Sequence, residues 1–392
     1  MANISFILDE FPGGGTERVT MNLARPLTEL GHKIFLFVHS LNIDKLPEKD
    51  LPFEYIKLPH PARRSKNYAT VVEAIRQHNI EVFFAPVSFP RYMPKLHALG
   101  ICKIAHVLHS RPFYELITKH EALIRLPQRT FKYLCRTYLL DWPRYLLGYF
   151  HWKFRRRYKM IYRNSDAYGV LFDSYGREIA KELGIRYEGS KFVTLPNPIV
   201  ANNDGHDNTA SREKVVGYVG RLTYYDKRVD RLLAVWHKVY NQFPDWKLWI
   251  IGEGGEEQRL KQYVAENNIA RVEFLGYTPH VEQLYPKMDI VCLTSNYEGC
   301  PMVLLEAQDY GCATIAFDCC SGIGEILAPN WENGVYVPNG DIDAYAEALA
   351  RLMNDEETRK TIQRKGMENV KRFSVANSVA QYDALIRKLC AK

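Results

Sequence analysis

Glu298 and Glu306 bracket the start of a short helix that follows a buried strand in the sequence. The apolar run Ile290 to Leu293 is typical of a buried strand, and Pro301 is favoured in the first turn of a helix that Gly311 can end. Backbone N–H groups and the dipole at a helix N-terminus attract a phosphate or another anion. The stretch therefore predicts a strand, loop and helix unit that binds an anionic ligand.

The two carboxylates would not bind a diphosphate directly, because both groups are negatively charged. They suit hydroxyl groups on either side of it, since Glu298 lies in the loop and Glu306 lies about a turn and a half into the helix. A single glutamate usually lies on a solvated face. Glu306, however, stands between Leu305 and Ala307 in a helix that is otherwise largely apolar, which favours a binding role.

Glu298, seven intervening residues and Glu306, with Gly-x-Pro after the first glutamate, resemble the signature of the retaining glycosyltransferases of family 4. The resemblance extends in the expected order along nearly the whole chain. It implies the α/β fold called GT-B, in which two doubly wound Rossmann-like domains face each other across a cleft and a C-terminal helix crosses back to the first domain. It also implies that the residues at the helix start bind the donor, namely Gly299, Cys300, Pro301 and Met302.

A glycine-rich loop follows the N-terminal strand Asn3 to Leu8 and leads into a long helix. The loop has neither the spacing of a dinucleotide fingerprint nor the lysine of a P-loop, and its glycines can also form a simple tight turn. In the resembled family, a Gly-Gly-x-Glu sequence lies beside the donor phosphates and sugar. Gly14 and Gly15 match that loop, so the resemblance implies that both contact the donor.

Strand and helix patterns alternate along the first part of the chain, which predicts a parallel sheet with ligands at the carboxyl ends of its strands. His106 and His109 close the strand Lys103 to Leu108. A histidine near a strand end is more often structural than catalytic. Family members carry a functional histidine at the corresponding strand end, close to the transferred sugar. The resemblance therefore assigns this role to His109 and ranks His106 second.

A Gly-Arg-Leu sequence follows the strand Val215 to Val219, and the family pattern adds a lysine a few residues later. Arg221 and Lys227 match the two cations, which would offset the charge of the donor diphosphate and of the leaving nucleoside diphosphate. The family usually has Lys-Gly, whereas Arg228 stands in the glycine position here, so the cation that reaches the phosphate stays open. In the family, the loop that holds Tyr277 borders the nucleotide base.

The composition is that of an ordinary globular protein, with 46% hydrophobic and 25% charged residues, and 392 residues suggest two domains. The eight cysteines lack metal-ligand spacing and fit reduced core residues. The N-terminus has no signal-peptide pattern, and the chain has no uninterrupted apolar run of about 18 residues. We therefore expect a cytoplasmic protein that is neither secreted nor membrane-spanning.

The net charge of +7 is concentrated in one segment. Residues 113–163 hold 12 Lys or Arg against 3 Asp or Glu, a net charge of +9, together with 13 aromatic residues. This mixture suits the surface of an anionic membrane, which would place the protein on the inner face of the cell membrane. It is equally consistent with an amphipathic helical pair packed on the first domain. Stacking on single-stranded nucleic acid is the third and weakest interpretation, and no nucleic-acid partner is expected.

The domain organisation follows from the elements and a polar tract after Asn197 that has no periodicity. Residues 1–200 are expected to form an N-terminal Rossmann-like acceptor domain with the insertion 113–163. Residues 201–373 are expected to form a C-terminal Rossmann-like domain that binds the nucleotide sugar. Residues 374–392 are expected to form a helix that packs on the N-terminal domain.

The resemblance implies a retaining hexosyltransferase. The enzyme would move a hexose or N-acetylhexosamine from a nucleotide-diphosphate sugar, most simply a UDP-sugar, to a growing surface polysaccharide, a lipopolysaccharide or a lipid-linked glycan. Glu298 would hold hydroxyl groups of the donor sugar, His109 would polarise or position the reacting sugar, and Glu306 would hold the ribose. Because cations and helix N-termini offset the phosphate charge, we expect no essential metal and no cofactor besides the nucleotide sugar.

Other functions fit parts of the pattern. A sugar-nucleotide epimerase of the same architecture would need additional acid and base residues around the nucleotide, and a phosphorylase would need a cofactor lysine that the sequence does not locate. A non-catalytic scaffold that binds membrane or nucleic acid would use residues 113–163 alone. Hydrolysis of a nucleotide sugar distinguishes an enzyme from such a scaffold.

Overall fold

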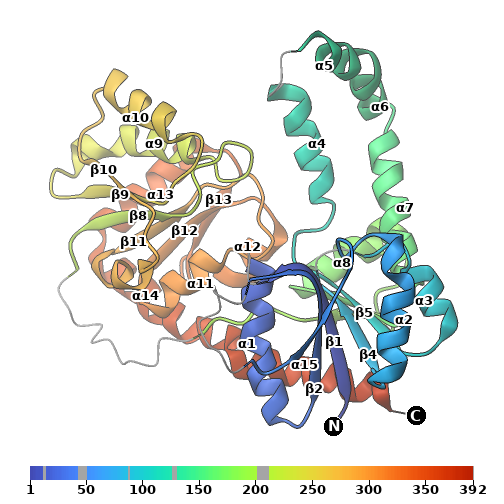
Figure 1. Ribbon diagram of the computed structural model, residues 1–392. Coiled ribbons are helices and arrows are strands. Elements are labelled where there is room, and N and C mark those ends of the chain that lie inside the picture. Colours follow the sequence, from blue (N-terminus) through green and yellow to red (C-terminus); the bar gives the residue numbers. More distant parts are fainter. Residues whose placement is uncertain (12–14, 43–50, 87–88, 126–129, 201–211, 392) are drawn as a thin grey trace. The chain divides into compact units, whose positions relative to one another are not determined.

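The computed structural model describes residues 1–11, 15–42, 51–86, 89–125, 130–200 and 212–391. The chain forms two compact α/β units (Figure 1). Unit 1 comprises Met1–Val200 together with Ser374–Lys392, and unit 2 comprises Ala201–Phe373. Each unit is built on a parallel sheet of its own.

The sheet of unit 1 has seven described strands in the order β3-β2-β1-β4-β5-β6-β7. Its strands are β1 (Asn3–Phe11), β2 (Lys33–Leu41), β3 (Glu54–Lys57), β4 (Val82–Ala85), β5 (Lys103–Leu108), β6 (Ala167–Val170) and β7 (Phe192–Thr194). The helices of this unit are α1 (Gly15–Glu29), α2 (Tyr68–Gln77), α3 (Met93–Leu99), α4 (Tyr114–Arg125), α5 (Phe131–Arg136), α6 (Trp142–Leu146), α7 (Tyr149–Arg163), α8 (Asp173–Leu183) and α15 (Val375–Cys390). The reversal of strand order at β1 and β4 is that of a doubly wound sheet.

Apolar alternation in β1 explains how one face of this sheet is covered. Ile4, Phe6 and Leu8 are at most 2% exposed, because successive strand residues point to opposite faces and these three share one of them. They belong to one hydrophobic core with Leu23 and Leu27 of α1. Helix α15 joins the same core, although it comes from the far end of the sequence.

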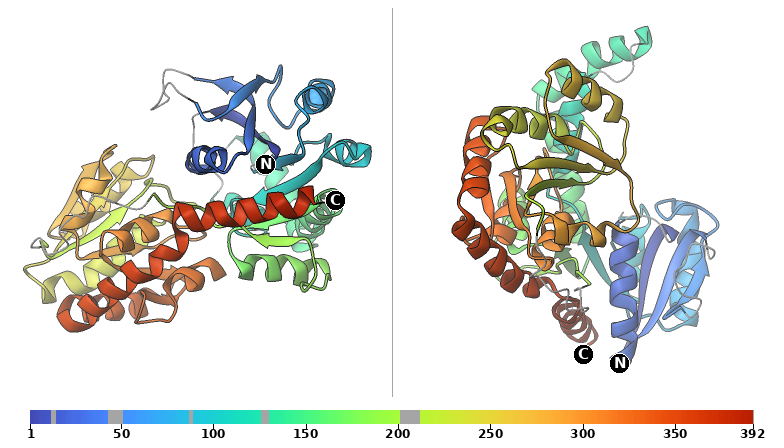
Figure 2. Two further views of the ribbon diagram at one scale, coloured as in Figure 1. Left: turned by 90° about the horizontal axis from the view of Figure 1, so that it is seen from below. Right: turned by 90° about the vertical axis from the view of Figure 1, so that its left-hand side faces the viewer.

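Helix α15 lies beside α1 and along the sheet of unit 1 (Figure 2). Ser374 caps its N-terminus by accepting a hydrogen bond from the backbone N–H of Asn377 at 3.3 Å. The ring of Tyr382 lies 5.6 Å from the ring of Phe84 in β4. Asp383 forms a 2.8 Å contact with the ring nitrogen Nε2 of the buried His32. These contacts make α15 part of the N-terminal unit.

Between β5 and β6 the alternation of strands and helices is interrupted by a helical hairpin, described over residues 114–125 and 130–163. Helices α4 and α7 pack against each other and project from the sheet of unit 1, and α5 and α6 lie at the far end of the hairpin (Figure 1). A π-helical turn, Thr137–Asp141, joins α5 to α6. The basic aromatic segment is therefore a helical pair that is anchored at one end only.

The sheet of unit 2 has six described strands in the order β10-β9-β8-β11-β12-β13. Its strands are β8 (Val215–Val219), β9 (Lys247–Ile251), β10 (Val272–Gly276), β11 (Ile290–Leu293), β12 (Ala313–Asp318) and β13 (Val335–Pro338). Its helices are α9 (Val229–Val239), α10 (Glu257–Glu266), α11 (Met302–Asp309), α12 (Ser321–Leu327), α13 (Ile342–Asn354) and α14 (Glu356–Val370). A core around the fully buried Trp236 packs α9 and α13 on one face of the sheet. The order reverses at β8 and β11, so the loops after these two strands mark the switch point.

Candidate active site

The loops that follow β8 and β9 in unit 2 touch through their backbones. Gly252 has φ +132°, and a Cβ atom there would lie 2.0 Å from the carbonyl oxygen of Gly220. A Cβ atom on Gly254 would lie 2.3 Å from the carbonyl oxygen of Leu222. Only glycine allows this approach. The glycines of this region therefore stack the two loops and fix the backbone that carries Arg221.

Arg221 projects from this stacked edge into solvent. Its Nη2 lies 3.0 Å from Oδ2 of Asp226, and 74% of the side chain remains exposed. Asp226 also accepts a hydrogen bond from the hydroxyl of Thr223, and its carbonyl oxygen accepts one from the backbone N–H of Asn296 at 2.7 Å. The loop after β8 is thus bonded to the loop after β11, and Arg221 keeps a guanidinium surface that a ligand can reach.

Lys227 and Glu298 form an ion pair between these same two loops. The distance from Lys227 Nζ to Glu298 Oε1 is 2.7 Å, and the hydroxyl of Ser295 donates to the same oxygen at 2.6 Å. The Lys227 side chain is 20% exposed and that of Glu298 is 9% exposed. The structure therefore brings together one predicted phosphate cation and the predicted sugar-binding carboxylate. The sequence did not indicate this pairing or the part that Ser295 takes in it.

Arg228, the alternative cation, is held away from Glu298 by other partners. Its guanidinium makes hydrogen bonds of 3.0 and 2.9 Å to the two oxygens of Asp230 and lies 4.5 Å from the ring centre of Tyr224. Its backbone has φ 50° and ψ 48°, the left-handed conformation at the start of α9. Glycine adopts this conformation without strain, which explains physically why a Lys-Gly sequence suits the position. Lys227, not Arg228, points to the loop after β11.

Helix α11 carries the second glutamate of the pattern. The helix begins at Met302, so Pro301 precedes its first turn as the N-cap residue. The hydroxyl of Tyr285 donates a 2.9 Å hydrogen bond to Glu306 Oε2, and Tyr285 is 1% exposed. Burial, followed by the neighbouring carboxylate, raises the pKa of Tyr285 well above its ordinary value, so the phenol stays protonated and fixes Glu306. Tyr285 is a positioning residue that the sequence analysis missed.

The remaining predicted donor residues lie in different surroundings. Gly299 and Cys300 belong to the loop before α11, where burial raises the pKa of the Cys300 thiol and its sulfur lies 3.9 Å from that of Met302. Tyr277 follows β10 and is 66% exposed, so the structure does not join it to the Lys227 and Glu298 cluster. Gly15 is the first residue of α1 in unit 1, and Gly14 lies outside the described residues.

His109 lies just beyond β5 in unit 1. Its Nδ1 donates a 2.9 Å hydrogen bond to Oδ1 of Asn197, a buried residue beyond β7. Burial lowers the pKa of His109 to about 4, although the bond to Asn197 acts in the opposite direction. The imidazole is therefore neutral near pH 7, with Nε2 as the unprotonated ring nitrogen. Asn197 fixes this tautomer, although its position in the sequence indicates only the end of a domain.

His106 has a structural environment. It is 3% exposed, its Nδ1 donates to the carbonyl oxygen of Ala85 at 2.9 Å, and its ring meets the ring of Tyr168 edge-on at 5.0 Å. Burial lowers the pKa of His106 to about 3, so it stays neutral inside the core. His106 also lines the cavity beside His109.

A polar cavity of about 170 Å³ lies beside His109, at the carboxyl ends of β4 and β5. Helices α4 and α7 contribute Glu115, Arg157 and Tyr158 to its lining. Tyr158 donates to Glu115 at 3.3 Å, and Arg157 Nη1 lies 3.4 Å from the other Glu115 oxygen. The buried hydroxyl of Tyr168 lines the cavity and has no hydrogen-bond partner among the described residues. The cavity thus offers an unsatisfied buried polar atom to a ligand.

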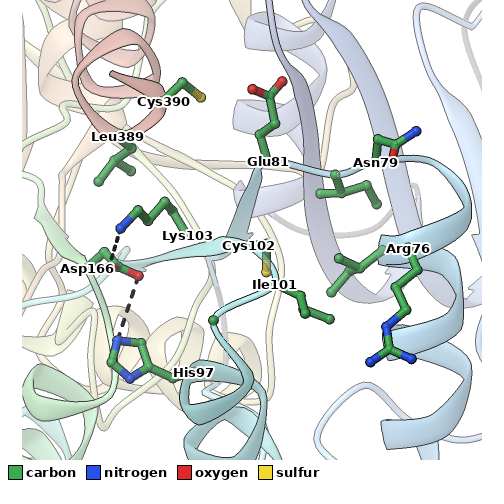
Figure 3. Close-up of a pocket in the computed structure, with 13 residues that line it drawn as sticks. Arg76, Asn79, Glu81, His97, Ile101, Cys102, Lys103, Asp166, Leu389 and Cys390 are labelled. Carbon is green, nitrogen blue, oxygen red and sulfur yellow. Dashed lines mark hydrogen bonds and ion pairs between the residues drawn. The ribbon is translucent and has the colours of Figure 1, made fainter. Parts of the chain in front are cut away.

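A larger cavity of about 570 Å³ lies at the opposite edge of the same sheet (Figure 3). Lys103 is the first residue of β5, and Asp166 immediately precedes β6. In this cavity Lys103 Nζ lies 3.5 Å from Asp166 Oδ1, and His97 Nε2 lies 3.7 Å from Asp166 Oδ2. Ligands of doubly wound sheets bind at the carboxyl ends of the strands, and this cavity is at the amino ends. The carboxyl ends of the strands are therefore the better candidate for an active site.

Among the residues the structure describes, no group of three or more His, Cys, Asp or Glu side chains is arranged to hold a metal ion. All eight cysteines are free thiols. No described helix has both the length and the apolar character needed to cross a membrane.

Comparison with known proteins agrees with this architecture in both units. Residues 13–202 match the family model "Glycosyltransferase Family 4", and residues 202–369 match "Glycosyl transferases group 1". The amylovoran biosynthesis glycosyltransferase AmsD of Erwinia amylovora is 34% identical over 167 residues, which are 42% of this chain and 45% of AmsD. This chain therefore matches less than half the length of that relative.

Two further proteins match along nearly their whole length. The "GalNAc-alpha-(1->4)-GalNAc-alpha-(1->3)-diNAcBac-PP-undecaprenol alpha-1,4-N-acetyl-D-galactosaminyltransferase" of Campylobacter jejuni is 25% identical over 99% of both chains. The crystal structure of Anabaena Alr3699/HepE in complex with UDP superimposes with a TM-score of 0.74 at 17% identity, and covers 99% of this chain and 100% of that one. With its two doubly wound units and both family matches, this chain belongs to the family 4-like glycosyltransferases of the GT-B fold.

Proposed function

We propose that the protein is a retaining glycosyltransferase that moves a hexose or N-acetylhexosamine from a UDP-sugar to a growing surface glycan or a lipid-linked glycan. The observation that carries the proposal is the cluster of Lys227, Ser295 and Glu298 on the loops after β8 and β11. Glu306 lies in α11, the helix that follows the second of these loops. The UDP complex of HepE and the undecaprenol-linked acceptor in the name of the Campylobacter relative support the choice of donor and acceptor.

Unit 2 supplies the groups for the donor. Arg221 presents an exposed guanidinium and Lys227 a partly buried ammonium at the carboxyl edge, and both suit a diphosphate whose negative charge grows as it leaves. Glu306, held by Tyr285, accepts hydrogen bonds from the ribose hydroxyls. Glu298 accepts hydrogen bonds from the sugar hydroxyls, and its ion pair with Lys227 couples sugar binding to phosphate binding.

The chemistry proposed is a substitution on one face of the sugar ring. The bond from the anomeric carbon to the phosphate oxygen breaks, the acceptor oxygen forms its bond on the same face, and the acceptor proton passes to the leaving phosphate. Retaining glycosidases use a different route, in which a second carboxylate about 5–5.5 Å from the first attacks the sugar as a nucleophile. His109, neutral and oriented by Asn197, positions the reacting sugar through Nε2 in unit 1.

The test is a panel of UDP-sugars and other nucleotide sugars, followed by hydrolysis of the preferred donor and by transfer to lipid-linked and free saccharides. Nuclear magnetic resonance of the product gives the anomeric configuration. Arg221→Ala and Lys227→Ala should each cost roughly 2–4 kcal/mol in transfer. Inverted product overturns the retaining mechanism. Activity of both variants within twofold of the unmodified protein overturns the phosphate assignment.

A further inference from the structure

Exposed apolar side chains gather on the helical hairpin. Of the sixteen large hydrophobic residues that are exposed among those described, nine lie within residues 113–163. They are Ile124, Phe131, Tyr138, Leu139, Leu140, Leu146, Leu147, Tyr149 and Trp152. Soluble proteins seldom expose a contiguous apolar surface without a partner for it. The hairpin therefore presents a surface that the fold of unit 1 does not cover.

The two ends of the hairpin differ in how they are packed. At the base, α7 buries Tyr158 and Ile161 against unit 1. At the far end, neither α5 nor α6 has a buried residue. We call residues 131–149 the hairpin tip. Leu146 and Leu147 there are 76% and 84% exposed, so the apolar surface belongs to the tip and not to the base.

The charges of the hairpin divide in the same way. At the base, Arg155 donates to the carbonyl oxygen of Glu182 at 2.7 Å, and Arg157 lies 3.4 Å from Glu115. At the tip, Arg136 and Arg144 lie 3.8 and 4.0 Å from the carboxylate of Asp141 but remain 70% and 50% exposed. The single acidic residue of the tip, Asp141, is 7% exposed and lies 2.8 Å from Lys119 of α4. The outer surface of the tip is therefore apolar and positively charged.

We propose that the hairpin tip docks this protein on the surface of an anionic lipid bilayer. Exposed leucines between arginines match the two layers of such a surface, because the apolar chains enter the headgroup and acyl boundary while the guanidinium groups contact lipid phosphates. The short helices lie on the bilayer and do not cross it. Single-stranded nucleic acid fits less well. Stacking needs aromatic rings, and although Phe131, Tyr138 and Tyr149 are exposed at the tip, the other four exposed apolar residues there are leucines.

The test is sedimentation of the full-length protein with vesicles of phosphatidylcholine alone or with about a third of phosphatidylglycerol. The unmodified protein should pellet with the anionic vesicles and remain in the supernatant with neutral ones. The variant Leu146→Ser/Leu147→Ser should bind the anionic vesicles at least about tenfold more weakly, because both side chains lose their insertion into the boundary. The control Leu30→Ser/Leu99→Ser changes two exposed leucines of unit 1 outside the hairpin and should bind normally.

The contribution of the tip arginines to vesicle binding is tested separately. Arg136→Gln/Arg144→Gln should weaken binding to anionic vesicles about 20- to 30-fold, since each surface arginine contributes about a fivefold factor. The control Lys66→Gln/Lys95→Gln removes two exposed charges from the rest of unit 1 and should leave binding within twofold. Higher salt should weaken the binding of the unmodified protein to anionic vesicles and should have a smaller effect on the binding of the arginine variant.

Three results would overturn the proposal. The first is an unmodified protein that stays in the supernatant with every vesicle. The second is binding to single-stranded oligonucleotides that the tip variants abolish while vesicle binding is unchanged. The third is a concentration-dependent dimer in analytical ultracentrifugation that Leu146→Ser/Leu147→Ser converts to monomer, because a second copy would then cover the tip. Donor hydrolysis should stay normal in all four variants, so a failure here is distinct from a failure of the proposed enzyme function.

Discussion

The ion pair between Lys227 and Glu298 can be tested by a double-mutant cycle. The variants are Lys227→Met, Glu298→Gln and the two combined, and the quantity compared is the free energy of unfolding of unit 2. If the pair forms as the structure has it, the combined variant should be more stable than the sum of the two single losses predicts.

The magnitude follows from the 2.7 Å distance and the burial of both side chains. At that distance two unit charges attract each other by about 6 kcal/mol in a medium with an effective dielectric constant of about 20. Removing both ions from water offsets most of this attraction. A net coupling free energy of about 1.5–3 kcal/mol is expected, as for hydrogen bonds between charged groups. Lys227→Met alone should cost about 3 kcal/mol, because it leaves a buried carboxylate without its cation.

Urea unfolding followed by tryptophan fluorescence measures these values. Four of the six tryptophans lie in unit 2, namely Trp236, Trp246, Trp249 and Trp331. The matched control is Arg221→Met, whose guanidinium is 74% exposed, so it should cost less than about 1 kcal/mol. A coupling free energy below about 0.5 kcal/mol would refute the ion pair, and so would an Arg221→Met variant that loses as much stability as Lys227→Met.

Three further predictions concern activity, pH and metals. Glu306→Ala should raise the KM for the donor with little change in kcat, because ribose is held alike in the ground and transition states. Glu298→Ala and His109→Ala should instead mainly lower kcat. Equal losses of donor affinity in all three variants, with unchanged turnover, would contradict these roles. The free energy of unfolding should fall as the pH drops from about 6.5 towards 4, because burial lowers the pKa of folded His109 to about 4 while the unfolded histidine binds its proton near pH 6.5. In His109→Gln that slope should be shallower, and an unchanged slope in urea titrations would count against a neutral His109 ring. Transfer should continue in excess EDTA, and a loss that Mg²⁺ or Mn²⁺ restores would show that a metal is essential.

Strand positions were predictable because buried parallel strands are uninterrupted apolar runs. The predicted strands Lys103 to Leu108 and Ile290 to Leu293 have the bounds of β5 and β11. The edge strand β13 was not predicted, since it has four residues, one of them partly exposed, and ends at Pro338. The first turn of α11 was also placed one residue early, because proline is favoured at the first helical position whereas Pro301 is the N-cap residue here.

The side-chain partners in the site could not be predicted from strand ends alone. Lys227 and Glu298 are 71 residues apart, and they meet because β8 and β11 are neighbours in the sheet although two strands separate them in the chain. Likewise, His109 meets Asn197 across β6, which lies between their strands. Periodicity gives the end of each strand, whereas these contacts depend on strand order and on the direction of each side chain.

Helix α15 also sets the order in which the new chain can fold during synthesis. The ribosome must make all of residues 201–373 before it makes the helix that completes the core of unit 1. At about 5–20 residues per second, the N-terminal unit waits about 10–40 s for α15 after residue 200 has been made. Until then the apolar face formed by residues such as Phe6 and Phe84 lacks Tyr382 and its neighbours. The continuous unit 2 can finish folding first, while the N-terminal unit keeps this apolar face uncovered until α15 is made.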